Sequence, residues 1–365
     1  MKTILLQLML IISANAFSQQ PLRGNCGTPT PHRALRFTAA QMNEAQRTID
    51  YAYVVNIYVH ILTDDNGSNA AATDSSVKAD LQTMSNFFKP HNICFILLGI
   101  DYRSSTLINN MMNIDNSSHI ATLTSGTNHA NCIDIYVHQS FSDPNIAGNA
   151  YAIPSDFISV LGSTISRPTL AHEMGHALGL YHTFETAYGE ECPDGSDCSG
   201  DGDLICDTPA DFNGSQNMVA TGTPCVYTGT QTVNCDIFPF SNYQAYDPSE
   251  TNMMSYWGNC RNNFTPQQGL RMRVTLSNEN IVKNCLTVYD APVTTGNTDI
   301  NITGEWYVSA KNEISILSTG TGRIRILGGV LDKWINAGTR IRIGPGSEIR
   351  PDASATRFVI NPLCE

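Results

Sequence analysis

Residues 172–182 read HEMGHALGLYH, and this stretch decides how the chain is interpreted. Residues four apart lie on one face of a helix, so His172 and His176 can point at the same ion. Gly179 can adopt the backbone conformation that ends a helix, and His182 then arrives from outside it. Three imidazoles leave one position of a tetrahedral metal open for water, which is the arrangement of catalytic zinc. The stretch therefore predicts a zinc-binding helix with His172, His176 and His182 as ligands.

Glu173 follows the first of these histidines and can reach water in the open position. Zinc lowers the pKa of a bound water from near 16 to roughly 7. Glu173 would take the proton as this water attacks a peptide carbonyl, and would pass it to the leaving amine. The alternative is a set of ordinary helix residues, because a bare His-Glu-x-x-His string is short enough to occur by chance. Gly179 and His182 at fixed offsets favour zinc.

The composition narrows the class of protein. The chain has 365 residues, of which 33 are acidic and 21 basic, so its formal net charge is 21 − 33 = −12. The hydrophobic content of 41% is enough for a proper core, and the length favours more than one folded unit. The acidic balance argues against nucleic-acid binding, which rests on Lys and Arg.

Residues 1–18 have the pattern of a signal peptide. Lys2 precedes an apolar run from Ile4 to Ile12, and small residues follow at a possible cleavage site. A membrane anchor is the weaker alternative, because the run is shorter than the roughly 20 residues that span a bilayer. We therefore expect a secreted, extracellular protein without a membrane span.

Hydrophobic periodicity predicts the elements that follow. The β-branched and aromatic residues 53–62 indicate a strand, and residues 74–89 have apolar positions at helical spacing. Further strands are expected at 93–100, 133–138 and 148–154, and helices at 168–180 and from Thr265 to about Leu276. The expected organisation is a signal peptide at 1–18, a pro-segment at 19–50, an α+β (α/β-type) catalytic domain at 51–288, a linker at 289–303 and an all-β module at 304–365.

The C-terminal module alternates apolar and polar residues between Gly-rich turns. The string Arg-Ile-Arg-Ile starts at Arg323 and again at Arg340, which is compatible with a β-roll of weak repeats or with chance recurrence. From Asn301 onward the balance of charge is 8 − 6 = +2. A mildly basic appendage favours binding to a surface, an export component or an anionic polymer, and the sequence does not choose among these.

Several motifs resemble a known family. The string HExxHxxGxxH resembles the metzincin zinc signature, and residues 252–256 resemble the methionine turn of that clan. Residues 180–184, 202–209 and 264–272 are similar to the pappalysin (cytophagalysin) family. The resemblance covers about residues 25–286. It implies a metzincin-like domain with a twisted sheet and a zinc-binding helix, and the activity of a zinc metalloendopeptidase on protein or peptide substrates.

The resemblance also implies roles for single residues. Met254 would form an apolar floor under the zinc, which is compatible with simple core packing. Tyr256 would donate a hydrogen bond to the oxyanion; the alternative is a buried tyrosine with a structural partner. The C-terminal β-module favours a rival interpretation, a surface adhesin with a vestigial zinc site. Glu173, all three histidine ligands and Tyr256 argue against it.

The acidic loop from Asp194 to Asp207 is expected to bind a cation. Carboxylates close together repel each other unless a cation lies among them, and oxygen ligands suit calcium. The family's Gly-Asp-x-Val-x-Asp-Thr-Pro stretch, with Ile205 in the Val place, implies Asp203, Asp207 and Thr208 as Ca²⁺ ligands. A solvated acidic loop is the alternative.

The chain has 11 cysteines, an odd number, so at least one lacks an intrachain partner. The family pattern implies the pairs Cys192–Cys235 and Cys225–Cys260, while Cys94–Cys132 and Cys198–Cys206 are guesses from proximity along the chain. The family's pro-segment carries a Cys-Gly-Thr string like that at Cys26. This thiolate would occupy the water position of the zinc and keep a zymogen latent; the alternative is a disulfide to Cys285 or Cys364.

Overall fold

The computed structural model describes residues 25–31, 33–47, 53–164, 168–212, 225–236, 241–287 and most of 290–360. The predicted signal peptide lies outside the described residues. Among the described residues, no helix is both long and apolar enough to cross a membrane.

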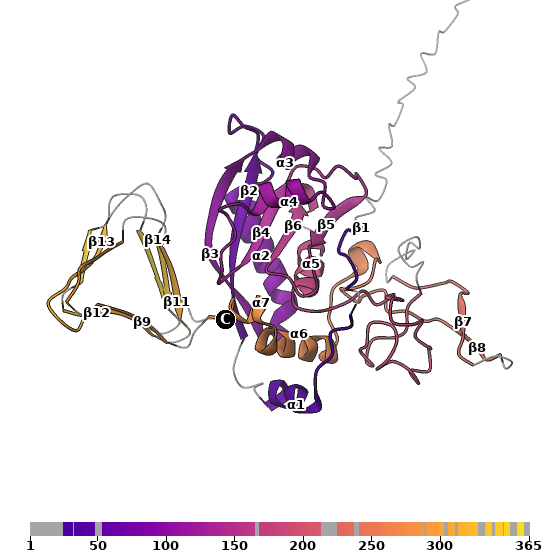
Figure 1. Cartoon of the computed structure of the whole chain (residues 1–365). Coiled ribbons are helices and arrows are strands. Elements are labelled where there is room, and N and C mark those ends of the chain that lie inside the picture. Colours follow the sequence, from indigo (N-terminus) through magenta and orange to yellow (C-terminus); the bar gives the residue numbers. More distant parts are fainter. Residues whose placement is uncertain are drawn as a thin grey trace, which may run out of the picture.

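A six-stranded sheet organises the described residues up to Thr287 (Figure 1). Its strand order is β1 (Asn25–Cys26), β5 (Ile146–Ala150), β6 (Phe157–Leu161), β4 (Ile133–His138), β2 (Tyr53–Thr63) and β3 (Ile93–Ser104). All neighbours pair in parallel except β5 and β6, which are antiparallel. The antiparallel strand β5 is the outermost strand of the catalytic region, and β1 of the predicted pro-segment adds to its free edge.

Both faces of the sheet are covered, which gives the mixed α/β fold. Strand β2 is a nearly continuous apolar run because its side chains are buried on both sides. Helices α2 (Asp74–Phe88) and α5 (Thr169–Ala177) cover one face and pack on residues such as Val59 and Ile61. Helices α3 (Thr106–Met111) and α4 (Ser117–Thr124) cover the other face around Leu62 and Tyr136.

The loop after α5 and the segment beyond it complete this region. A capping box of Thr265 and Gln268 starts α6 (Pro266–Asn278), as the Thr-Pro pair predicts. Helix α1 (Ala39–Arg47) packs on α6 (Figure 1). The remaining short elements are η2 (Lys89–His91), η3 (Gly162–Thr164), β7 (Thr232–Asn234), β8 (Tyr243–Ala245), η5 (Gly258–Cys260) and α7 (Asn280–Lys283).

The C-terminal strands form three parallel three-stranded sheets. Their orders are β9–β12–β15, β10–β13–β16 and β11–β14–β17. Their bounds are β9 (Asp290–Thr295), β10 (Ile300–Ile302), β11 (Trp306–Ala310), β12 (Glu313–Ser318), β13 (Ile324–Leu327), β14 (Lys333–Ala337), β15 (Arg340–Ile343), β16 (Ser347–Arg350) and β17 (Thr356–Ile360). Each pass through three strands is one rung of a parallel β-helix, and strands β11 and β14 lie beside β3 (Figure 1).

The structure differs from the expectation for this module in two ways. Strands β9 and β10 lie in the range 289–303 that the sequence assigned to a linker, so the strand pairing begins earlier. The two Arg-Ile-Arg-Ile strings are 340 − 323 = 17 residues apart. Paired strands are farther apart, since Glu313 pairs with Arg340 at a spacing of 340 − 313 = 27. The strings therefore lie on different sheets and do not mark the repeat.

Candidate metal centre

Helix α5 presents His172, Glu173 and His176 on adjacent turns, and all three side chains are buried. The helix ends at Ala177, three residues before the predicted end, and Gly179 takes a positive φ of 95°. A Cβ at Gly179 would lie 2.4 Å from Thr275 Oγ1, so both the turn and the packing on α6 require glycine here. The turn brings His182 back to the helix.

The three imidazoles converge on one point. Their Nε2 atoms are 3.1 to 3.2 Å from one another. His172 Nδ1 lies 2.7 Å from the Met253 carbonyl oxygen, and His176 Nδ1 lies 2.8 Å from that of Leu180. Each Nδ1–H donates to a carbonyl, so each Nε2 keeps its lone pair and directs it into the centre. These two lone pairs and the Nε2 atom of His182 face one another and form a donor set for a cation.

The electrostatics agree with this geometry. Burial lowers the pKa of all three histidines, to about 4 for His176 and well below the usual value for His172 and His182. Neutral imidazoles are the form that binds metals. The donor set therefore fits zinc: His172, His176 and His182 would hold it, with a fourth position toward the pro-segment.

Met254 and Tyr256 approach the centre from the turn that follows. Met254 is fully buried, and a Cβ added at Gly175 would lie 2.6 Å from its sulfur, so the methionine lies directly against the zinc-binding helix. The Tyr256 ring contacts the His172 and His182 rings, with centroids 5.8 and 4.9 Å away. Its hydroxyl accepts from Cys26 N and donates to Cys26 O, both at 3.1 Å.

Cys26 reaches the same point from the predicted pro-segment. Its sulfur and the three Nε2 atoms all lie within 4.8 Å of one another. The thiol also contacts Thr28 Oγ1 at 2.9 Å and Glu173 Oε2 at 3.2 Å. Cys26 is a free thiol, so the alternative disulfide to Cys285 or Cys364 is not formed.

Arg261 is a residue that the sequence analysis missed. Its guanidinium is 7% exposed, donates to Gly258 O and Ser255 O at 3.0 and 3.3 Å, and lies against the ring of His172. It therefore holds the turn that carries Tyr256. A single arginine after a cysteine gives no signal of this role, which depends on the folded turn.

The predicted calcium ligands do not form one cluster. Asp203 accepts from Ile205 N at 2.9 Å and from Thr208 Oγ1 at 3.0 Å. Asp207 instead accepts from Thr265 Oγ1 and Gln267 N at the start of α6.

The long loop is tied by disulfides. Cys192 is bonded to Cys235, Cys198 to Cys206 and Cys225 to Cys260. The guess that Cys94 pairs with Cys132 is wrong, because Cys94 is disulfide-bonded and Cys132 is a free thiol. Cys94 lies in β3 and Cys132 directly precedes β4, and these two strands flank β2 on opposite sides. Proximity along the chain cannot reveal this separation.

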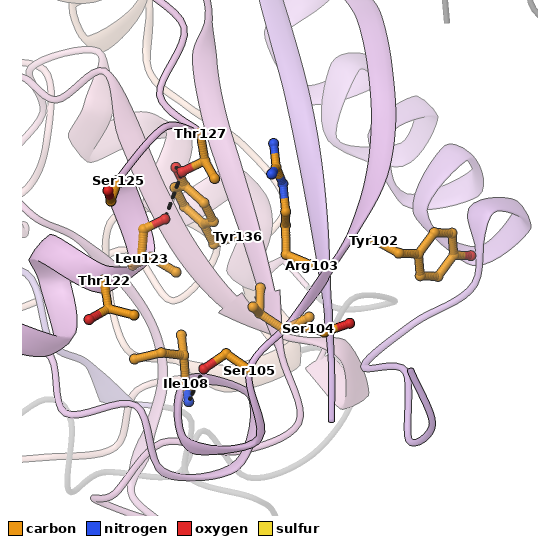
Figure 2. Close-up of a pocket in the computed structure, with 11 residues that line it drawn as sticks. Tyr102, Arg103, Ser104, Ser105, Ile108, Thr122, Leu123, Ser125, Thr127 and Tyr136 are labelled. Atoms are coloured by element: carbon orange, nitrogen blue, oxygen red, sulfur yellow. Dashed lines mark hydrogen bonds between the residues drawn. The ribbon is translucent and has the colours of Figure 1, made fainter. Parts of the chain in front are cut away.

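A cavity of about 350 Å³ lies on the other face of the sheet, beside α3 and α4 (Figure 2). Its lining includes Ser105, Thr127 and Tyr136, with the last two joined by a 2.7 Å hydrogen bond. Arg103 pairs with Asp101 at 2.7 Å. The eleven lining residues include no histidine, cysteine or carboxylate, so this cavity lacks the groups for hydrolysis.

Comparison with known proteins shows to which class of enzyme this chain belongs. The model of peptidase family M43, described as pregnancy-associated plasma protein-A, matches residues 109–277, which contain the whole histidine cluster and the methionine turn. The protein is a zinc metalloendopeptidase, and its residues 109–277 are similar to the pappalysin family.

Curated relatives of this metalloprotease carry names of the same class. It is 28% identical to an extracellular metalloprotease of Neurospora crassa over 66% of this chain and 90% of that protein. It is 27% identical to an extracellular metalloprotease of Sordaria macrospora over 68% of this chain and 86% of that protein. These names agree with the expected secretion, and the metalloprotease is extracellular. The adhesin alternative finds no support among them.

A solved structure also matches this metalloprotease. "Mirolysin in complex with compound 9" aligns at a TM-score of 0.43 and 20% identity, over 64% of this chain and 96% of that chain.

Proposed function

We propose that this metalloprotease cleaves peptide bonds with Glu173 as the general base, and that it is made as a latent zymogen. The observation that carries the proposal is the convergence of three Nε2 lone pairs beside a buried carboxylate. When bound, zinc supplies a Lewis acid that polarises the scissile carbonyl and acidifies water. The rest of the chemistry belongs to side chains of this chain.

Glu173 is suited to moving a proton. Burial raises the pKa of Glu173 to about 7, although hydrogen bonds from Cys26 and Thr28 oppose the rise. A carboxylate with a pKa near the working pH can take a proton from the attacking water and return it to the leaving amine. The strand β5 leaves no room for a side chain at Gly148, because a Cβ there would lie 2.6 Å from Glu173. The carboxylate is thus fixed between the strand and the metal centre.

Tyr256 is suited to binding the carbonyl of a substrate. Its hydroxyl now donates to the carbonyl of Cys26, a residue that pairs in parallel with the edge strand β5. Once the pro-segment leaves, the same hydroxyl can donate to the scissile carbonyl and stabilise the negative charge that develops there.

Replacement of Glu173 tests the mechanism. We expect Glu173→Ala to keep zinc and to lose roughly 10²–10⁴-fold in peptide hydrolysis, because general-base catalysis is worth about that much. The assay is cleavage of a fluorogenic peptide by the processed enzyme, with zinc content measured in parallel. Activity of the variant above a few per cent of wild type would rule out this role.

The pro-segment crosses the catalytic domain at several anchored points. Thr30 donates to Glu185, Arg271 donates to the carbonyl of Leu35, and Arg36 binds loop carbonyls near Gly200. Burial and the Glu173 carboxylate raise the pKa of the Cys26 thiol, and a bound cation reverses that effect. A thiolate on zinc would exclude water and substrate together.

Cys26 variants test latency. We expect unprocessed Cys26→Ala to hydrolyse a short peptide at least about tenfold faster than the unprocessed wild type, since the fourth zinc position is then open. Thr30→Ala removes one anchor but keeps the thiol, and serves as the control. After removal of residues 19–47, all three should be equally active. Full activity of the intact wild-type protein would contradict latency.

We also propose a calcium ion beside the loop, with Asp203 and Thr208 joined by Glu191, which the sequence analysis missed. Glu191 and Asp203 are buried, and burial with neighbouring carboxylates raises the pKa of each to about 8. Glu191 Oε2 has no hydrogen-bond partner in the described part of the chain. We expect Ca²⁺ to raise the melting temperature of wild type but not of Glu191→Gln; an unchanged wild type would refute the site.

A further inference from the structure

A second cavity lies beside the predicted pro-segment, at the end of β5. It has a volume of about 290 Å³ and is separate from the cavity of Figure 2. Gly27 and Pro29 of the predicted pro-segment form part of its lining. Its apolar walls include Ile114, Tyr151 and Phe157, which lie before α4, directly after β5 and at the start of β6. The cavity therefore adjoins the chain that reaches the metal centre.

The predicted pro-segment runs along β5 from the metal centre to this cavity. Cys26 lies at the metal centre, and Gly27 N donates to Gly148 O at 2.9 Å. One residue further on, Ala150 N donates to Thr28 Oγ1 at 2.8 Å. Extended residues advance by about 3.3 Å each, so the two cavity-lining residues lie one and three positions from the residue at the metal. A substrate strand that takes the place of β1 on this edge would present a side chain to the cavity within three residues of the scissile bond.

Glycine at position 27 leaves the cavity open toward the chain. A Cβ added at Gly27 would point at the end of the Ile114 side chain and would lie 3.2 Å from Asn149 Oδ1. Both of these residues line the cavity. A side chain at this place of an extended chain is thus directed into the cavity, and glycine carries none. The predicted pro-segment lies over the cavity without filling it, whereas a substrate residue with a long side chain can enter.

The polar groups of the cavity are acceptors and anions. Asn149 is 1% exposed, and its Oδ1 has no hydrogen-bond partner in the described part of the chain. Asp115 and Asp156 also line the cavity, and neither forms an ion pair among the described residues. The twelve lining residues include no lysine, arginine or histidine. A buried acceptor without a donor costs free energy, so the cavity favours a ligand that brings a donor and a positive charge.

We propose that this cavity is a substrate subsite that binds a lysine or arginine side chain within three residues of the scissile bond. The inference rests on the proposed peptide hydrolysis and adds the class of substrate. The aliphatic stem of either side chain would pack on Ile114 and Tyr151, as long basic side chains do on apolar surfaces. The charged tip would donate to Asn149 Oδ1, and Asp115 and Asp156 would balance its charge.

Paired peptides test the subsite in the processed enzyme. Two fluorogenic substrates differ at a single position, with arginine in one and norleucine, which keeps the stem without the charge, in the other. Each of the three positions on either side of the scissile bond is tested in turn. At one of them we expect kcat/KM to be at least about tenfold higher for arginine, because a hydrogen bond to a charged group is worth about that factor. Equal kcat/KM values at every position would overturn the proposal.

Variants of the lining assign the preference to the cavity. Asn149→Leu removes the acceptor at similar volume, and Asp156→Asn removes one carboxylate. Each should reduce the ratio of the two kcat/KM values to below about threefold. Because both peptides are compared on one enzyme, partial unfolding of a variant cancels from the ratio. Asp247→Asn removes an exposed carboxylate outside the cavity and should keep the wild-type ratio. An unchanged ratio in both cavity variants would overturn the proposal.

Binding separates this subsite from the proposed hydrolysis. The affinities of the arginine and norleucine peptides for processed Glu173→Ala are measured by fluorescence anisotropy. We expect the arginine peptide to bind about tenfold more tightly, whether or not Glu173 is the general base. Equal affinities would overturn the subsite. A retained difference in affinity, with no hydrolysis by the processed wild type, would contradict the proposed function and leave the subsite supported.

Discussion

The catalytic region contains two clusters with histidines, on opposite faces of one sheet. At the metal centre, the Nδ1 atoms of His172 and His176 donate to carbonyls and three Nε2 atoms face one another. In the second cluster, His60 Nδ1 lies 2.7 Å from Asp101 and its Nε2 lies 3.1 Å from Asp134. In both clusters, three or more ligand-type atoms lie within 4.8 Å of one another.

The two clusters differ in which group supplies the positive charge among their ligand-type atoms. Burial lowers the pKa of the metal-centre histidines, whose neutral rings leave a place for a cation. Burial would also lower the pKa of His60, but hydrogen bonds to Asp101 and Asp134 outweigh it and raise that pKa. In the second cluster both ring nitrogens of His60 face carboxylates, an arrangement that favours the protonated ring. A group of ligand-type residues close together is therefore not enough to define a metal site. The ligand atoms must also carry lone pairs that accept no hydrogen bond.

The largest expected effect separates the clusters by activity. His176→Ala should lower peptide hydrolysis at least about a thousandfold, because the zinc that polarises the carbonyl loses a ligand. His129→Ala removes a histidine whose Nδ1 lies 2.7 Å from Asp134, and should change kcat/KM by less than about twofold. Rates of fluorogenic-peptide cleavage by the processed proteins measure both. A comparable loss in the two variants would erase the distinction.

A smaller effect, on stability, should fall on the second cluster. His60→Gln leaves Asp134 buried with fewer partners, and should lower the free energy of unfolding by roughly 3 kcal/mol. Urea denaturation measures the change. His119→Gln, at a half-buried position of α4 with no aspartate partner among its hydrogen bonds, is the control and should cost less than about 1 kcal/mol. If the two variants are equally stable, His60 and its aspartates are not a balanced buried network.

The His60 contribution should also depend on pH. A folded pKa above the unfolded value of about 6.5 means that the contribution is complete below that pH and is lost as pH rises through the folded pKa. The difference in unfolding free energy between wild type and His60→Gln should thus shrink from pH 6 toward pH 9. A difference that grows with pH would show the opposite shift.

Local sequence could predict that His172, His176 and His182 converge, because they lie within eleven residues and one helix turn fixes the geometry of the first two. Strands β2 and β4 and helices α2 and α6 were predicted for the same reason, since periodicity and capping residues are local signals. Strand β6 was missed because a short buried strand has no alternation of its own.

Features that depend on distant contacts were out of reach. Arg261 and Glu191 acquire their roles only through the folded turn and loop. The parallel β-helix was expected only as an all-β module, because the pairing of strands 23 to 27 residues apart leaves no fixed repeat in the sequence. The wrong Cys94–Cys132 pair has the same cause.

Zinc content per chain tests the central claim most directly. Metal analysis of the purified, dialysed protein should find one zinc per chain in wild type and in His129→Ala, and none in His176→Ala. This result would assign the metal to the three converging Nε2 atoms and exclude the His60 cluster. Two zinc ions in wild type with one lost in His129→Ala, or full zinc in His176→Ala, would contradict the account.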